Sequence, residues 1–150
     1  MSELLDVLKK NELLRNIEEL PYSGESKIIK AETDKENLEK VARYLKDNGV
    51  DNVFLLSTVD MGNELYNVYH FMNFKSNTII ELKVTMKSDD MVVKSLTSVW
   101  KGANWHERES YDMFGIKYEG HPKLERILQV KDSTIFPFRK EFKLNVEGNK

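Results

Sequence analysis

Residues 65–86, LYNVYHFMNFKSNTIIELKVTM, decide the fold of this chain because they predict a β-hairpin. Residues 65–74 are rich in Tyr, Val and Phe, which favour strands, and residues 75–77 supply a turn. In residues 80–86, apolar side chains alternate with Glu, Lys and Thr. This alternation predicts a strand with one buried face and one face in water. We therefore predict two antiparallel strands here.

Upstream of the hairpin, the sequence predicts two helices and two strands. Leu and Ile recur at helical spacing across residues 4–17, before Pro21 and Gly24 interrupt the pattern. Residues 26–31 have the composition of a short strand between turn residues. The uninterrupted apolar run at residues 53–59 is typical of a central strand covered on both faces.

A clear helical signal lies between these two strands. Thr33 and Glu36 have the spacing of a capping box, in which each side chain satisfies a free backbone amide at the helix start. The helix then has an apolar face, and Asn48-Gly49 ends it. The residues of that face are Leu38, Val41, Ala42 and Leu45.

A further helix is predicted at residues 92–100, where Val, Leu and Trp recur at helical spacing before Gly102. Residues 1–102 are therefore expected to form an α+β domain of two layers, a mixed sheet of about four strands with helices packed on it. Residues 103–150 differ in composition and are expected to form a partner-binding motif and an extended C-terminal arm of the same unit.

Composition excludes several functional classes. The 150 residues include 23 basic and 25 acidic side chains, so no strong field attracts nucleic acid or anionic lipid. The absence of cysteine excludes disulfides, thiolate zinc sites, cysteine-ligated iron–sulfur clusters and a catalytic thiol in this sequence. No window approaches the ~20 apolar residues of a membrane span, and the charged N-terminus is unlike a signal peptide. We expect a soluble, cytoplasmic chain.

Residues 105–116, WHERESYDMFGI, carry the strongest functional signal. Asn104 is a candidate cap for a short helix, and Gly115 a candidate end. Ionisable residues lie beside aromatic ones on both faces of this helix. Such a pattern is typical of a surface buried against another protein, where charged groups must be paired.

The residues after this helix predict a bend and then an arm. Gly120 permits a tight turn, and Pro122 favours an extended His121. Residues 136–142, FPFRKEF, combine three Phe with adjacent charges. We expect this arm to lie along a partner, with Arg126 among the residues that pair with carboxylates. The chain should then be sensitive to protease from about residue 103 until a partner covers it.

Three alternatives assign chemistry to the same residues. A metal site would use His106, Glu107, Glu109 and His121, but the spacing of the zinc-protease motif is absent. Acid–base catalysis would use Glu107, Glu109 or Asp112, and a proton relay would use Glu109, Asp112 and His121. Ion pairing at an interface explains these residues more simply. The rival interpretation is a free-standing metal-dependent enzyme. No phosphate-binding loop or basic–aromatic strip supports nucleotide or nucleic-acid binding.

The motif W-x-E-R-E-x-x-D-M-F-G-I, followed by G-H-P-x-L-x-R-I-L, resembles the signature of a known family. That family is the C-type, thirty-kilodalton subunit of respiratory complex I, with its equivalents in energy-converting hydrogenases and archaeal dehydrogenases. Pro137, Arg139, Lys140 and Phe142 resemble its later P-L-R-K-D-F block, from which Phe138 and Glu141 depart. The resemblance covers about residues 26–144. These departures, and a sequence that stops at position 150, leave open an archaeal or hydrogenase-type complex.

The resemblance implies a cofactor-free structural subunit of a membrane-bound oxidoreductase complex, without catalysis of its own. It implies docking on the D-type large subunit, and contact with the small iron–sulfur subunit, at the cytoplasmic face of the membrane. Redox centres and any quinone or nickel–iron site would lie on neighbouring subunits. We expect partner contacts at Trp105, Glu107, Arg108, Glu109, Asp112, Phe114, His121, Arg126, Pro137, Arg139 and Lys140. We expect the backbone path to depend on Gly115, Gly120 and Pro122.

Overall fold

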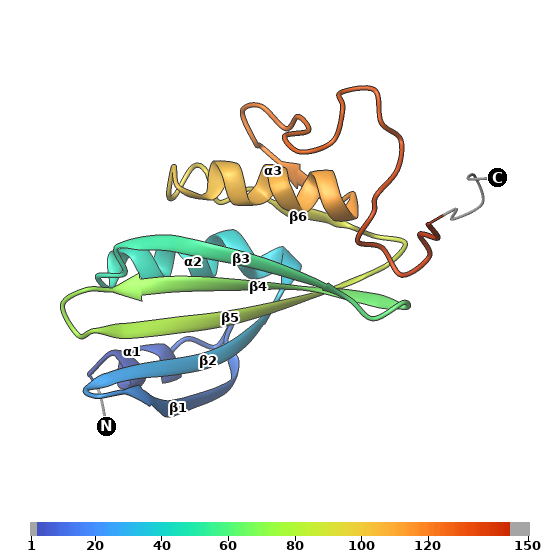
Figure 1. Ribbon diagram of the computed structural model, residues 1–150. Coiled ribbons are helices and arrows are strands. Elements are labelled where there is room, and N and C mark those ends of the chain that lie inside the picture. Colours follow the sequence, from blue (N-terminus) through green and yellow to red (C-terminus); the bar gives the residue numbers. More distant parts are fainter. Residues whose placement is uncertain (1–2, 145–150) are drawn as a thin grey trace.

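A computed structural model describes residues 3–144 and contains, within them, a five-stranded sheet of order β1-β2-β5-β4-β3 (Figure 1). The strands are β1 (Arg15–Ser23), β2 (Ser26–Asp34), β3 (Asn52–Asp60), β4 (Glu64–Asn73) and β5 (Thr78–Lys87). Neighbouring strands of the sheet are antiparallel, except β2 and β5, which are parallel, so the sheet is mixed. This confirms the predicted α+β class, with one strand more than expected.

The helices of the described residues are α1 (Glu3–Lys9), the short 3₁₀ helix η1 (Lys35–Asn37), α2 (Leu38–Asp47) and α3 (Ala103–Phe114). A separate pair of parallel strands is formed by β6 (Val92–Lys94) and β7 (Lys117–Glu119). In Figure 1, α2 lies behind the sheet, and α3 with β6 lies beyond the side of the sheet formed by β3.

The predicted hairpin is confirmed as β4 and β5, which pair from Glu64 opposite Lys87 to Asn73 opposite Thr78. Alternate residues of both strands face the core. The core also receives the apolar face of α2, whose four predicted residues are all buried. The sheet and the helix therefore bury complementary stripes, as their periods of two and 3.6 residues require.

The N-terminal prediction is wrong beyond α1. The helix ends at Lys9, and residues 15–23 form the edge strand β1. An edge strand tolerates Pro21 because its outward amide needs no ladder partner. The predicted capping box is also wrong, because Thr33 lies in β2 and its hydroxyl donates to the Leu13 carbonyl at 2.7 Å. Long-range pairing thus overrides the local helix signals.

The predicted central strand is an edge strand. β3 pairs with β4 alone among the described strands, and a bulge interrupts its register between Val53 and Leu55. Three apolar side chains of this strand are about two fifths exposed: Phe54, Leu55 and Val59. An apolar run indicates burial but does not state what provides it.

The predicted helix at residues 92–100 is also wrong. Val92–Lys94 forms β6, and the residues after it form turns. The Ser95 amide donates to the Glu119 carbonyl at 2.8 Å, which extends the pairing of β6 with β7. Leu96, Val99 and Trp100 are still buried. Their helical spacing therefore marks a buried segment whose backbone is held by β7 and α3.

Candidate functional site: helix α3 and the arm that follows it

Helix α3 spans Ala103–Phe114 with Gly115 as its C-cap, close to the prediction. Gly115 has φ 83° and donates its amide to the Tyr111 carbonyl at 2.8 Å, which closes the helix. A β-carbon there would lie 3.1 Å from the Phe136 ring. The position therefore favours glycine for its backbone angle and for the space that the arm leaves.

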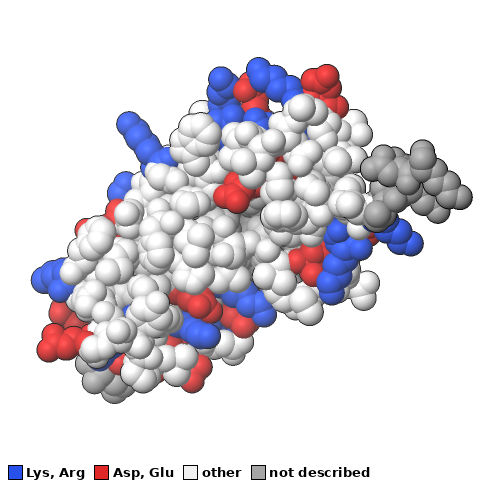
Figure 2. Space-filling view, viewed as in Figure 1, with Lys and Arg blue, Asp and Glu red and all other residues white. Residues whose placement is uncertain are grey.

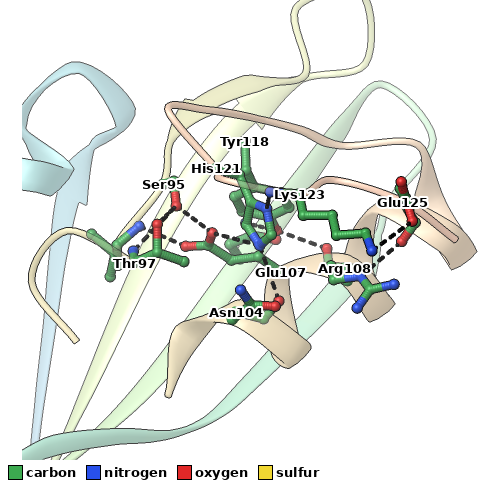
Figure 3. Close-up of polar contacts among 12 residues, drawn as sticks. Ser95, Thr97, Asn104, Glu107, Arg108, Tyr118, His121, Lys123 and Glu125 are labelled. Atoms are coloured by element: carbon green, nitrogen blue, oxygen red, sulfur yellow. Dashed lines mark hydrogen bonds and ion pairs between the residues drawn. The ribbon is translucent and has the colours of Figure 1, made fainter. Parts of the chain in front are cut away.

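Glu107 is fully buried and joins α3 to the turn after β6 (Figure 3). Its carboxylate accepts hydrogen bonds of 2.6 Å from the Ser95 hydroxyl and from the Leu96 amide. Burial raises the pKa of Glu107 to about 7, against the opposing effect of these two hydrogen bonds. The residue therefore holds the β6 turn against the helix from inside the fold.

His121 fastens the turn after β7 to the same helix (Figure 3). Its Nδ1 accepts the Lys123 amide at 3.0 Å, so a neutral ring carries its proton on Nε2, 3.2 Å from the Asn104 carbonyl. Nε2 also lies 4.0 Å from the Glu107 carboxylate. Burial lowers the pKa of His121, and the nearby charge of Arg108 lowers it further. The Asn104 contact places this turn on the start of α3, and the Lys123 amide fixes the ring within the turn.

Asp112 fastens the first part of the arm. Its carboxylate has no exposed surface and binds Arg126 Nη1 at 2.8 Å. It also accepts three consecutive backbone amides at 2.6–3.1 Å, those of Ile127, Leu128 and Gln129. Burial acts to raise the pKa of Asp112, but the amides and Arg126 lower it below the usual value. The chain therefore turns around this carboxylate.

Asp60, at the end of β3, fastens the second part of the arm. Its Oδ2 lies 3.1 Å from Arg139 Nε and accepts the Lys140 amide at 2.9 Å, while Oδ1 accepts the Gly62 amide at 2.8 Å. The Phe138 amide donates to the Met113 carbonyl at 3.1 Å, beside this ion pair. Burial opposes ionisation of Asp60, but the two amides and Arg139 lower its pKa. The sequence motif did not include Asp60.

These contacts correct the expectation that the arm lies only along a partner. Asp112 holds residues 126–129 on the chain's own domain, Asp60 holds residues 139–140, and the Met113 carbonyl holds the Phe138 amide. A buried carboxylate needs donors or a positive charge nearby, and the arm supplies backbone amides and the Arg126 guanidinium as donors, and Arg139 as an ion-pair partner of Asp60. The remainder of the predicted arm, residues 145–150, lies outside the described residues.

The other predicted site residues lie nearer the surface. Trp105 is 65% exposed, and the Arg108 guanidinium lies 4.8 Å above its ring. Arg108 Nε donates to the Glu125 carbonyl at 3.0 Å, and the Phe114 ring packs on Phe138 at 5.7 Å between centroids. Glu109, Lys140 and Pro122 are exposed, Pro137 is half-buried, and Gly120 has φ 85°. The structure thus divides the predicted partner contacts into two groups. The inner group is held inside the fold and consists of Glu107, Asp112, His121, Arg126 and Arg139. The outer group lies nearer the surface and consists of Trp105, Arg108, Glu109, Phe114, Pro137 and Lys140.

A buried polar network behind α3 was not anticipated. The Asn67 amide donates to Tyr118 Oη at 2.9 Å, and Tyr118 donates to the Ser110 hydroxyl at 2.8 Å. The Ser110 and Thr58 hydroxyls are 2.8 Å apart, and Thr58 donates to Asn67 Oδ1. Burial raises the pKa of Tyr118, so its hydroxyl stays protonated. Polar residues at buried strand positions were the available signal for this network.

The alternative metal site does not assemble. Within residues 3–144, no group of three or more His, Cys, Asp or Glu side chains could hold a metal ion. Of the predicted ligands, Glu107 and His121 approach each other, while Glu109 is exposed. No helix in the described part of the chain is long and apolar enough to cross a membrane.

Comparison with known families gives the class of protein. The family described as "Respiratory-chain NADH dehydrogenase, 30 Kd subunit" matches residues 31–147, which is most of the sequence. The chain therefore belongs to the thirty-kilodalton subunit family of respiratory-chain NADH dehydrogenase. The match runs from the second half of β2 through β7 and nearly the whole arm, so the site lies inside the region that defines the family.

Individual proteins with similar sequences are named as C-type or combined C/D subunits of NADH-quinone oxidoreductase. The C-type subunit of NADH-quinone oxidoreductase from Streptomyces coelicolor is 39% identical over 118 residues, covering 74% of this chain and 47% of the relative. Its namesake in a Roseiflexus species is 40% identical, covering 75% of this chain and 68% of the relative. The combined C/D subunit of a Psychrobacter species is 47% identical over 74 residues, 12% of its length. This chain thus spans about half the length of the Streptomyces relative.

Two solved structures have the same fold. A chain of the membrane-bound sulfane sulfur reductase, an archaeal respiratory membrane complex, superposes with a TM-score of 0.79 over 95% of this chain and 84% of that chain. The trypsin-resistant fragment of Nqo5 gives 0.60 over 81% and 96%. Sequence identity is only 20% and 23%, so these likenesses concern the fold alone.

Proposed function

We propose that this chain is a structural subunit of the peripheral arm of a membrane-bound, ion-translocating oxidoreductase complex of the NADH:quinone oxidoreductase type. In this role it docks on the D-type large subunit and carries no cofactor of its own. The observation that carries the proposal is membership of the thirty-kilodalton subunit family across residues 31–147. The names of its C-type relatives supply the kind of complex.

The relative named as a combined C/D subunit supports the large subunit as the direct partner. A name that joins C and D in one chain is expected where the two parts work side by side. The small iron–sulfur subunit is proposed as a second neighbour. This chain would reach the membrane only through the complex, at the cytoplasmic face. Iron–sulfur clusters and any flavin, quinone or nickel–iron site would then belong to neighbouring chains.

The division of the site into inner and outer groups supports a docking role. Buried carboxylates hold α3, the His121 turn and the arm in one arrangement. Because these carboxylates are buried, they are not themselves exposed to a partner. The outer group, including Trp105 and Arg108, is thereby presented on a rigid element. Aromatic and Arg side chains on rigid supports are the residues that dominate binding energy in protein interfaces.

The proposal is tested by affinity-tagging the full chain in its own organism, solubilising membranes gently and identifying the proteins that co-purify. A large subunit related to the nickel–iron hydrogenase large chain, with iron–sulfur and membrane subunits, is expected. The accompanying proteins would also identify the electron donor and acceptor. Recovery of the chain alone from soluble extract, with stoichiometric metal, would contradict the proposal and favour the free-standing enzyme.

A further inference from the structure

The two edges of the main sheet differ in protection. β1 contains Pro21, charged side chains and two interruptions of its register with β2, all of which discourage pairing with another chain. β3 has no charged residue from Asn52 to Val59, and after its bulge it pairs regularly with β4. An exposed, apolar and regular edge is a liability unless a helix, a loop or another chain covers it.

Helix α3 and the arm border this edge and form a groove with it. The groove encloses about 270 Å³ between the β3 backbone and the helix. Its apolar lining includes Leu55, Phe114 and Phe138, of which Phe138 is 59% exposed. Thr58 and Ser110 contribute hydroxyl groups to the lining. Figure 2 shows that the surface over β3 and the adjoining side of α3 is largely without Lys and Arg. Acidic atoms are exposed within this surface.

Glu109 lines the same groove and is the unpaired acid of α3. The carboxylates of Glu107 and Asp112 accept two and four hydrogen bonds, respectively, from side chains and amides of the chain. Within residues 3–144, the exposed Glu109 carboxylate has neither a hydrogen-bond nor an ion-pair partner. A single negative charge in an apolar groove selects a positive group on whatever fills it.

We propose that the β3 edge, Glu109 and Phe138 bind an extended segment of a partner protein. The segment is apolar except for one Arg or Lys, which pairs with Glu109, and its apolar side chains cover Leu55 and Phe138. The unpaired backbone of the edge favours an extended segment over a helix, because a strand can hydrogen-bond to it. Identification of the partner as the large subunit rests on the proposed function. The groove and the charge of Glu109 are observed in the structure and do not depend on that function.

The charge is tested with the tagged full chain, purified from solubilised membranes at several salt concentrations. Glu109→Arg should reduce recovery of the large subunit at least about tenfold, since like charges would meet in the groove. Glu109→Gln should also reduce recovery and should weaken its dependence on salt. The matched control is Glu36→Arg, at an exposed carboxylate of η1, which should leave recovery unchanged. Unfolding temperatures of the purified variants show whether each still folds.

The position is tested in intact cells, with a photo-reactive phenylalanine analogue in place of Phe138 and, as control, in place of the similarly exposed Tyr22 on β1. A crosslink from position 138 to a segment of another protein of the complex that contains Arg or Lys supports the proposal. Crosslinking to lipid, to a second copy of this chain, or to nothing overturns it.

The two tests separate the inference from the proposed function. If wild type recovers the large subunit while both Glu109 variants do so equally well, the inference fails and the proposed function stands. If wild type recovers no large subunit, the proposed function fails, and the crosslink in cells still decides whether another protein fills the groove.

Discussion

At the scale of single residues, the site depends on three carboxylates that this chain buries among its described residues. Asp112 and Asp60 each accept backbone amides and each form an ion pair with an arginine, and their pKa values are lowered. Glu107 has two hydrogen bonds but no Lys or Arg partner, and its pKa is raised to about 7. The number and charge of the donors therefore decide which form each carboxyl group favours.

Glu107 should make the folded chain less stable as the pH rises. The pKa of Glu107 is about 7 in the folded state and 4.5 in the unfolded state, so the folded state binds the proton more tightly. The free energy of unfolding therefore falls by about 3 kcal/mol as the pH rises from 4.5 to 7. Glu107→Gln should remove this loss, because an amide can bond Ser95 and Leu96 without a charge. Urea unfolding of both proteins at pH 5 and pH 8 measures the difference. Parallel pH profiles for the two proteins would refute this role of burial.

Asp112→Asn should destabilise the chain by about 2–4 kcal/mol, because Arg126 would stay buried without its counter-charge. The expected loss appears in urea unfolding at pH 7. Asp132→Asn is the control, since Asp132 is an exposed acid of the same arm. Equal stability of the two variants would mean that Asp112 does not hold the arm.

At the scale of elements, α3 and the arm form one unit because the helix ends where the arm returns to it. Gly115 closes the helix, Phe136 lies against that glycine, and the Phe138 amide donates to the Met113 carbonyl. The sequence predicted both ends of α3 within one or two residues. It could not predict the return of the arm, because the donors and the carboxylates that join them are 14 to 80 residues apart.

Gly115→Ala should cost more than an alanine at a turn glycine. Both Gly115 and Gly24 have positive φ, which costs about 1 kcal/mol for alanine, but a β-carbon at Gly24 meets nothing within 4 Å. At Gly115 it would also displace the Phe136 ring, for a total of about 2–3 kcal/mol. Thermal unfolding of the two variants measures the excess. Equal losses would show that the ring moves away without cost.

At the scale of the whole molecule, an inner layer of paired charges supports an outer surface of aromatic and charged groups. The sheet and α2 bury the apolar core, and the Glu107 contacts join α3 to the β6 turn beside it. This arrangement explains why a motif with so many ionisable residues lies in a folded region. The buried residues of the motif serve the fold, whereas the others lie nearer the surface.

Arg108→Ala should weaken assembly with the large subunit by about 2–5 kcal/mol, the usual cost of leaving a partner charge unpaired. Its guanidinium lies over the exposed Trp105 ring, where a partner could reach it. Co-purification yield and the salt needed for dissociation measure the effect. Arg43→Ala, which removes an exposed arginine on α2, is the control. Wild-type recovery of the Arg108 variant would contradict this contact.

The sequence by itself determined the hairpin, α2, the extent of α3 and the family. These features depend on local periodicity, on glycine at a helix end and on a long, chemically unusual motif. Tertiary structure alone decided that β3 is an edge, that residues 15–23 form a strand and that Glu107 and Asp112 point inward. Periodicity records which side of an element is buried, whereas the neighbour that buries it, or pairs its charge, is brought there by contacts distant in sequence.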